Sequence, residues 1–283
     1  MLFLMFACST APERPVEVRS LRKLGESQLE LANQEMDRSN FDAALIMLED
    51  TWRVAVSSDD PSLRIRTALS LGNAHFSLGQ KEEAYAVWKN ALQEAEDIRE
   101  LRAVCVVYIA RADLLSAREA AAAGDAADVK NTAQRVRTEV VEVIGFIKDR
   151  LYTAFAWTVI AMADKELGYY AEAEAFARRA LSIREKARYL EQAAFNWYLI
   201  ASIRSVAGDY AGAVQALFQA IGFDRRAENT YGLGADWRAL GDVYKKAGQA
   251  DASEAAYRRS ADIFRALRME SETAAEGDAG PPP

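Results

Sequence analysis

A fixed interval of forty residues runs through the second half of the chain. Trp157, Trp197 and Trp237 lie forty residues apart, and a glycine follows each of them eleven residues later. A constant period of roughly 20–50 residues is typical of chains built by stacking one small unit that contacts only its neighbours. The interval therefore predicts a repeat protein, and such proteins offer long binding surfaces more often than enzyme pockets.

The same period continues toward the N-terminus with slightly longer steps. Counting back from Gly168, the equivalent turn positions are Gly124, Gly79 and Ser39, at intervals of 44, 45 and 40 residues. Small residues recur seven positions before the six turns, at Ala32, Gly72, Ala117, Ala161, Ala201 and Gly241. Small side chains at a helix crossing let two helix axes approach closely. We therefore expect a helical hairpin around each turn.

These repeated positions resemble the tetratricopeptide repeat (TPR). The last unit matches the family's opening W-x2-L-G-x2-Y at the following positions: Trp237, Leu240, Gly241 and Tyr244. The second unit is nearly as close, although His75 stands where the family has tyrosine. The third unit, around Gly124, is degenerate. The resemblance covers about residues 16–269 and is similar to a longer variety with about forty residues per unit.

The resemblance implies an all-α fold: an α-solenoid, in the form of a right-handed superhelix of about six hairpins. The seams between units are expected to bury the tryptophans. Residues 16–269 would form this one repeat domain, and residues 1–15 a signal remnant and flexible tether. Residues 270–283 contain glycine, alanine, acids and three prolines, so we expect a disordered acidic tail.

Composition restricts the class of partner. The formal net charge is −7, which disfavours the basic face of a duplex nucleic-acid binder. The single histidine, His75, and the two cysteines, Cys8 and Cys105, provide neither paired histidines nor a Cys-x-x-Cys site for a metal. No nucleophile can be paired with His75 from the sequence, and no glycine-rich phosphate loop follows a strand pattern. We expect no metal, no cofactor, no nucleic-acid partner and no enzymatic activity.

An apolar run at the N-terminus ends at a cysteine. Residues Met1 to Ala7 precede Cys8, and this pattern resembles a bacterial lipoprotein signal, in which the peptidase cuts before a cysteine that then carries lipid. No basic residue precedes the run, and the run is shorter than a complete signal. Two interpretations stay open: a lipid anchor at Cys8 with its charged leader encoded upstream, or a frayed apolar terminus. We favour the anchor.

The TPR resemblance also implies where a partner would bind. In such arrays the first helix of each pair lines the concave face, and a few positions of each unit point into it. Mapped onto this chain, these positions nominate Asn33, Asn73, Phe155, Thr158, Phe195, Tyr198, Ser202, Arg238, Asp242 and Lys245. Asparagine can hold a peptide backbone through both its donor and its acceptor, and an aromatic centre suits an extended or helical peptide.

Three functions are compatible with this pattern. We expect a non-enzymatic scaffold, lipid-anchored through Cys8 in the bacterial envelope and facing the periplasm, that binds a partner protein or peptide for envelope assembly or transport. The alternative is a cytoplasmic regulator or sensor that binds a signalling peptide in the same groove. An enzyme or small-ligand carrier ranks last, because it would need a closed cavity near the irregular third unit.

Overall fold

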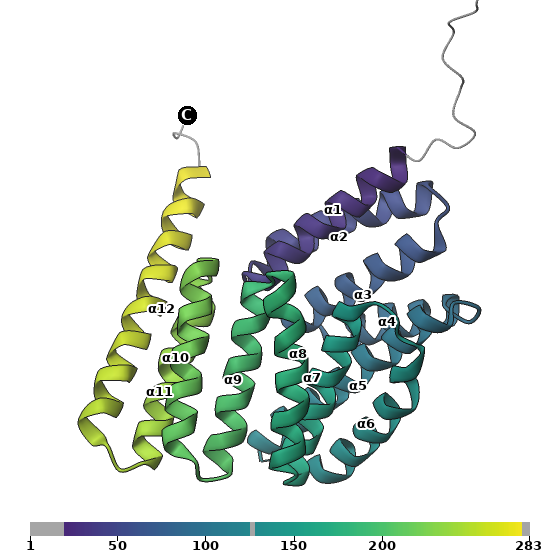
Figure 1. The fold of residues 1–283 in the computed structure, drawn as a ribbon. Coiled ribbons are helices and arrows are strands. Elements are labelled where there is room, and N and C mark those ends of the chain that lie inside the picture. Colours follow the sequence, from purple (N-terminus) through teal and green to yellow (C-terminus); the bar gives the residue numbers. More distant parts are fainter. Residues whose placement is uncertain (1–19, 125–127, 279–283) are drawn as a thin grey trace, which may run out of the picture.

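The described part of the chain is an array of helices. A computed structural model describes residues 20–124 and 128–278, and within these ranges it contains twelve α-helices, one short 3-10 helix and no strand. Figure 1 shows the later helices standing side by side, while α1 and α2 lie obliquely across one end of the array. The all-α solenoid predicted from the sequence is confirmed.

The helices pair in chain order as six antiparallel hairpins. These are α1 (Ser20–Asp37) with α2 (Phe41–Ser57), α3 (Pro61–Ser77) with α4 (Lys81–Glu94), α5 (Arg99–Ala122) with α6 (Val129–Val143), α7 (Arg150–Leu167) with α8 (Tyr170–Ala187), α9 (Leu190–Val206) with α10 (Tyr210–Ala227), and α11 (Thr230–Lys246) with α12 (Ala250–Asp278). The 3-10 helix η1 (Ile144–Phe146) follows α6 and lengthens the link from the third to the fourth hairpin.

A residue in the left-handed region closes each hairpin at the predicted position. Gly168 has a φ of 84°, and Ser39, the one non-glycine among the six, has a φ of 65°. This conformation lets the Tyr169 N–H donate to the carbonyl of Asp164 at 2.9 Å, which satisfies one of the free carbonyls at the end of α7. The other four predicted turn residues also have positive φ: Gly79, Gly124, Gly208 and Gly248.

Small residues allow the two helices of a hairpin to meet closely. In the second hairpin, a Cβ at Gly72 would lie 2.4 Å from Nε1 of Trp88. In the last hairpin, a Cβ at Gly241 would lie 2.6 Å from the Tyr257 ring. The third hairpin departs from this pattern. Val129, five residues after the turn at Gly124, is the first residue of α6, and the buried residues of this helix begin only at Ala133. The degenerate third unit is therefore also irregular in its packing.

The tryptophans are buried to different degrees. Trp88 has no exposed surface, but Trp157, Trp197 and Trp237 are only half-buried. The prediction that the seams bury all of these indoles is wrong for the last three. Their rings lie at the edge of the seam and are covered partly by polar side chains: the Arg259 guanidinium lies 4.6 Å from the Trp237 ring centroid.

The C-terminal segment also differs from the prediction. Helix α12 continues to Asp278, so residues 270–278 are helical where a disordered tail was expected. Alanine and glutamate in this segment are strong helix formers, and extending an existing helix avoids the cost of a new nucleus. Residues 279–283 and the predicted tether at 1–15, including Cys8, lie outside the described residues.

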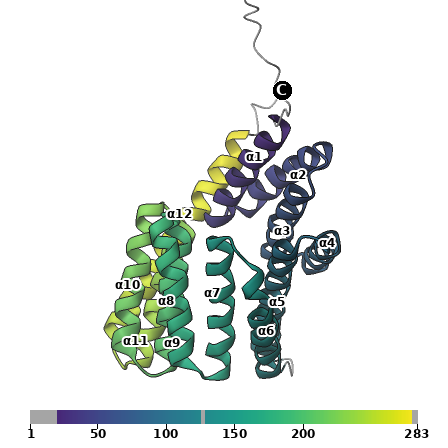
Figure 2. The same ribbon diagram turned by 45° about the vertical axis from the view of Figure 1, so that its right-hand side comes forward.

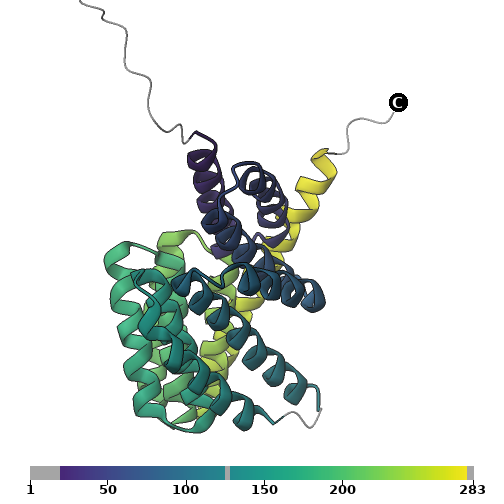
Figure 3. The same cartoon turned by 90° about the vertical axis from the view of Figure 1, so that its right-hand side faces the viewer.

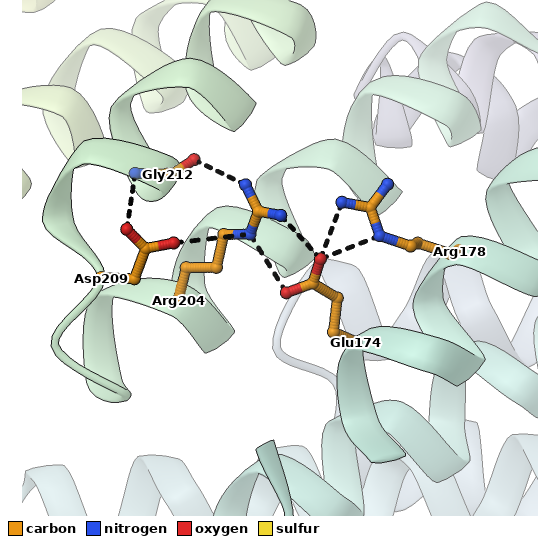
Figure 4. A network of polar contacts seen from close by, with 5 residues as sticks. All are labelled: Glu174, Arg178, Arg204, Asp209 and Gly212. Carbon is orange, nitrogen blue, oxygen red and sulfur yellow. Dashed lines mark hydrogen bonds and ion pairs between the residues drawn. The ribbon is translucent and has the colours of Figure 1, made fainter. Parts of the chain in front are cut away.

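Charged side chains fasten neighbouring hairpins to one another. Figure 4 shows Arg204 of α9 donating two hydrogen bonds to the carboxylate of Glu174 on α8. Nη2 donates to Oε1 at 2.8 Å, and Nε donates to Oε2 at 3.1 Å. The same guanidinium donates to the carbonyl of Gly212 at 3.2 Å, at the start of α10. A planar guanidinium has the geometry for this bidentate interaction with a carboxylate. Arg204 thus joins three consecutive helices.

Candidate functional site on the concave face

The first helices of the hairpins form the inner side of the array. Helices α1, α3, α5, α7, α9 and α11 contact one another in sequence, whereas successive second helices are splayed apart. Figures 2 and 3 show how this asymmetry bends the array, so that the first two hairpins tilt against the later, nearly parallel ones. The concave face is therefore built from the first helices, as the resemblance implied.

A ladder of polar side chains crosses every seam between these first helices. Each rung joins one first helix to the next: Arg66 to Glu26 at 3.2 Å, Ser70 to Asn33 at 2.7 Å, Arg111 to Asn73 at 3.0 Å, Arg118 to Glu166 at 3.2 Å, Lys165 to Ser202 at 3.3 Å and Lys246 to Ser205 at 3.4 Å. Of these twelve side chains, six are half-buried and three are exposed, so most of the set keeps accessible surface for further hydrogen bonds. We call this set the concave ladder.

A hollow beside the concave ladder contains three of the predicted groove residues. It measures about 120 Å³, lies between α9 and α11, and includes Tyr198, Ser202 and Asp242. Tyr198 is 36% exposed, and Phe195, one turn earlier on α9, is 42% exposed. An exposed aromatic pair beside hydrogen-bonding groups is a suitable contact for a peptide side chain.

The other predicted groove residues are spread along the array. Asn33 and Asn73 each accept one hydrogen bond within the concave ladder, and Phe155 packs against Tyr108 with ring centroids 4.7 Å apart. Arg238 and Lys245 are exposed on α11. These residues do not gather in one place; they follow the length of the concave face.

Thr158 does not line the concave surface. Its side chain is 2% exposed, and its hydroxyl donates to the carbonyl of Ala154 at 2.9 Å. The same oxygen accepts from the amide of Asn196 at 3.4 Å. A short side chain at this position stays inside the interhelical packing, where a partner does not reach it, whereas the longer Tyr198 at the equivalent position reaches the surface.

The first hairpin closes against the fifth. Gln192, in the first turn of α9, donates to both carboxylate oxygens of Asp37 at the end of α1, at 3.3 and 3.1 Å. Figure 1 shows this end of α1 beside the ends of α8 and α9. The two residues are 155 positions apart in the chain. The contact belongs to a cluster of neighbouring polar side chains, which we call the inner chamber and define by Asp37, Tyr108, Arg111, Tyr152, Arg184 and Gln192.

Burial changes the ionisation of the groups in the inner chamber. Desolvation raises the pKa of Asp37 to about 6, despite the opposing hydrogen bond from Gln192. Desolvation also lowers the pKa of Arg184 to about 10, and it lowers the pKa of Arg111. Asp37, Tyr108, Arg111 and Tyr152 nevertheless keep some accessible surface.

The sequence contains a signal for one part of this chamber but not for the rest. Arg111 occupies the same position of the third unit as Phe155 and Phe195 occupy in theirs, so applying the repeat to the degenerate unit would have nominated it. Arg184 lies on a second helix, which the family pattern does not place in the groove. The pairing of Asp37 with Gln192 depends on how the whole array curves.

A larger hollow lies beside the irregular third hairpin. It measures about 470 Å³ and is lined by residues 97–100, Gly145, Phe146 and Lys148. One of its two carboxylates, Glu100, already accepts from the backbone N–H groups of Lys148 and Asp149, both at 2.7 Å. Nearby, burial raises the pKa of the Cys105 thiol to about 12, which disfavours the reactive thiolate. Within residues 20–124 and 128–278, no cluster of three His, Cys, Asp or Glu side chains could hold a metal ion.

Comparisons with known proteins identify the repeat. The family model described as tetratricopeptide repeat matches residues 158–188, which span the end of α7 and all of α8. No curated protein sequence matches the chain significantly. The structural matches below have low sequence identity and therefore report on the fold alone.

Several solved structures share the fold. A Rap protein complexed with Competence and Sporulation Factor is similar with a TM-score of 0.59 at 15% identity, covering 86% of this chain and 66% of that one. BtubC (BKLC) from P. vanneervenii is similar with a TM-score of 0.53 at 17% identity, covering 86% of this chain and 92% of that one. PilW, a type IV pilus biogenesis factor, has a TM-score of 0.51 at 14% identity, covering 86% of this chain and 94% of that one. Residues 158–188 thus match a tetratricopeptide repeat, and the six phased hairpins of the described chain have a fold similar to that of these repeat arrays.

Proposed function

We propose that this chain is a non-enzymatic scaffold that binds a partner protein or peptide along its concave face. The observation that carries the proposal is the concave ladder, which crosses all five seams between first helices. Beside it, Phe195 and Tyr198 are exposed aromatic side chains that a partner could cover. A TPR-type fold supports binding of this kind, since extended concave surfaces are what such arrays offer.

Replacing Tyr198 by alanine is expected to weaken partner binding about tenfold, as the loss of one aromatic contact would. The melting temperature should change little, because the ring is 36% exposed. Crosslinking the native chain in cells, followed by purification and quantitative mass spectrometry, measures how much partner is retained. Tyr169→Ala is the matched control, since this tyrosine is 48% exposed at a turn outside the concave face. Equal loss of partner from both variants would contradict the groove assignment.

The proposed setting is the bacterial envelope, with a lipid anchor at Cys8 and the array facing the periplasm. The apolar run that ends at Cys8 supports the anchor, although these residues lie outside the described part. Within the described ranges, the structure has no helix with the length and apolar character to cross a membrane. A lipid anchor would confine the scaffold to a surface and raise its effective concentration there.

Replacing Cys8 by serine is expected to move the protein from the membrane fraction to the soluble fraction, because serine cannot carry the thioether-linked lipid. Cys105→Ser is the control, since Cys105 is a buried free thiol that the anchor does not use. Detergent-phase partitioning of protein expressed with its native upstream sequence measures the change. Unchanged partitioning of Cys8→Ser would contradict the anchor.

A second candidate is a cytoplasmic regulator that binds a signalling peptide. The observation in its favour is the fold shared with a Rap protein complexed with Competence and Sporulation Factor, together with the closure of the first hairpin against the fifth. The genomic sequence upstream of Met1 discriminates between the settings. An in-frame start that adds Lys or Arg before the apolar run favours the lipoprotein, and an immediate in-frame stop favours the regulator.

A further inference from the structure

The two ends of the array expose different kinds of side chain. At the C-terminal end, the exposed face of α12 is charged, and its side chains pair with one another: Arg258 with Glu254 at 3.4 Å and Arg265 with Asp262 at 2.9 Å. A polar outer face on the last unit caps a repeat array and keeps it soluble. The C-terminal end is therefore closed to further stacking.

Helix α1, at the N-terminal end, exposes a row of leucines instead. Leu21, Leu24 and Leu31 are 49%, 48% and 49% exposed. Their spacing of three and seven residues places them on one side of the helix, and the buried side is a different one that includes Leu29 and Ala32. Figures 1 and 3 place α1 at the outer edge of the array. We call the three exposed leucines the leucine stripe.

The leucine stripe lies on a side of α1 that is free of charge along most of its length. With 3.6 residues per turn, the leucines share this side with uncharged polar residues: Ser20, Ser27, Gln28 and Gln34. The first charge on this side is Glu35, which already accepts from Arg38 at 3.2 Å and from Asn40 at 2.7 Å. Depletion of charged residues is typical of the centre of a protein–protein interface.

Two kinds of cover fit this face poorly. A helix that lies on a lipid surface has a polar side rich in Lys and Arg, but α1 exposes one lysine, Lys23, with the acids Glu26 and Glu30. Head-to-tail stacking of copies would need an apolar face at the C-terminal end, where α12 exposes ion pairs. A face that pairs with itself about a two-fold axis meets neither difficulty, because both copies contribute the same stripe.

Antiparallel pairing of two α1 helices brings the leucines together. A two-fold axis near residue 26 places Leu21 opposite Leu31 of the partner subunit. The same register places Lys23 beside Glu30 of the partner subunit, on the flank of the leucine stripe. Among the residues that the structure describes, neither Lys23 nor Glu30 takes part in an ion pair. One register therefore covers the leucines and pairs both of these charges.

We propose that the leucine stripe is the interface of a homodimer in which the two α1 helices pair antiparallel. The contact between two helices of 18 residues, each about 27 Å long, is small beside a standard protein interface. We therefore expect a weak dimer, with a Kd of about 10–100 μM. The dimer would hold two concave faces at a fixed separation, so that a partner with two binding segments gains avidity. The inference goes beyond the proposed function, since it concerns assembly of the chain with itself.

Sedimentation velocity of the full chain tests the dimer. The chain carries Cys8→Ser, so that a lipid does not itself assemble the protein. Between about 1 and 200 μM, which brackets the expected Kd, the weight-average mass should rise from the chain mass of 31.3 kDa toward twice that value. Leu24→Glu and Leu31→Glu should each raise the Kd at least tenfold, because each would desolvate a charge in the interface. Val141→Glu is the control, since Val141 is 46% exposed on α6 and should not affect the dimer.

A charge exchange tests the antiparallel register. Lys23→Glu and Glu30→Lys should each weaken the dimer several-fold, because each brings like charges together across the interface. The double variant should recover the affinity of the parent, because each pair forms again with its charges exchanged. Lys23 and Glu30 are about 10 Å apart along the helix, too far to pair within one copy. Recovery in the double variant would therefore report a contact between copies.

Cysteine crosslinking tests the position of the two-fold axis. Ser27 lies close to this axis, so Ser27→Cys in the Cys8→Ser chain should crosslink two copies through a short bismaleimide. Gln34→Cys is the control, because its two copies would be about 20 Å apart along the helices. Cys105 does not compete, since it is buried and burial raises the pKa of its thiol to about 12.

Three results would overturn the proposal. A chain that stays monomeric over the whole concentration range would show that something else covers the leucine stripe, such as the chain's own apolar run, residues 1–7. A dimer that survives both leucine substitutions would place the interface elsewhere. Equal crosslinking from positions 27 and 34, or a double charge variant that does not recover, would contradict the antiparallel pairing.

Discussion

Replacing Trp88 by alanine is expected to lower the free energy of unfolding by about 3–5 kcal/mol, the usual cost of truncating a fully buried aromatic residue. Trp88 has no exposed surface, packs over Gly72, and donates from Nε1 to the carbonyl of Leu69 at 3.1 Å. The rings of Phe76 and Tyr85 lie 5.9 Å from its own ring. Urea denaturation followed by circular dichroism measures the loss.

Trp197→Ala is the matched comparison, because this indole is half-buried at the edge of its seam. Its ring is covered in part by Arg178, whose guanidinium lies 5.8 Å from the centroid. We expect a loss of about 1–2 kcal/mol, since less apolar surface is re-exposed. Equal losses for both variants would show that exposure does not distinguish the two tryptophans, and would contradict the packing described above.

Raising the pH should weaken the last two hairpins through Asp224 and Asp236. These carboxyls are 3% and 2% exposed and lie against each other between α10 and α11. Desolvation raises the pKa of Asp224 to about 7, and desolvation with the negative charge of Asp224 raises that of Asp236 to about 9. The folded chain therefore keeps protons that the unfolded chain releases near pH 4.

The sign of the pH effect follows from those protons. The contribution of this pair to stability is complete below the unfolded pKa and is lost as pH rises toward 7 and then 9. The loss is about 1.4 kcal/mol per pH unit for each proton that only the folded state retains.

Asp236→Asn keeps a neutral side chain at every pH. Between pH 5 and pH 9 its free energy of unfolding should therefore fall less than that of the native chain. The difference should be at least the linkage of one proton, about 1.4 kcal/mol per pH unit. Asp242→Asn is the control, because Asp242 is exposed on the same helix. Urea denaturation at several pH values gives the slopes. Parallel pH profiles for native chain and Asp236→Asn would contradict the raised pKa values.

The periodic features of the fold could be predicted from the sequence because they are local. Positive φ at Ser39 and Gly168, and close packing at Gly72 and Gly241, each follow from one residue and its position in the repeat. Exposure could not be predicted in this way. Trp88 and Trp197 are both large apolar residues at phased positions, but how much of each ring is covered depends on the neighbouring hairpin.

Neither the chemistry nor the location of the inner chamber could be predicted from a single unit. Arg184 with Asn196, and Asp224 with Asp236, occupy equivalent positions forty residues apart. The two positions are in contact in both units, but a cation with an amide in one unit is replaced by two carboxyl groups in the next. The contact between Asp37 and Gln192 arises from rotation accumulated over several hairpins, which no single unit encodes.

Site-specific photo-crosslinking tests most directly whether a partner lies along the concave face. A photoreactive amino acid would replace Tyr198 in the hollow between α9 and α11 or, as a comparison, Phe218 on the second helix α10, which is 47% exposed. We expect a partner adduct from position 198 and none from position 218. An adduct of the same partner from position 218 alone would place binding on the other face and contradict the proposed function.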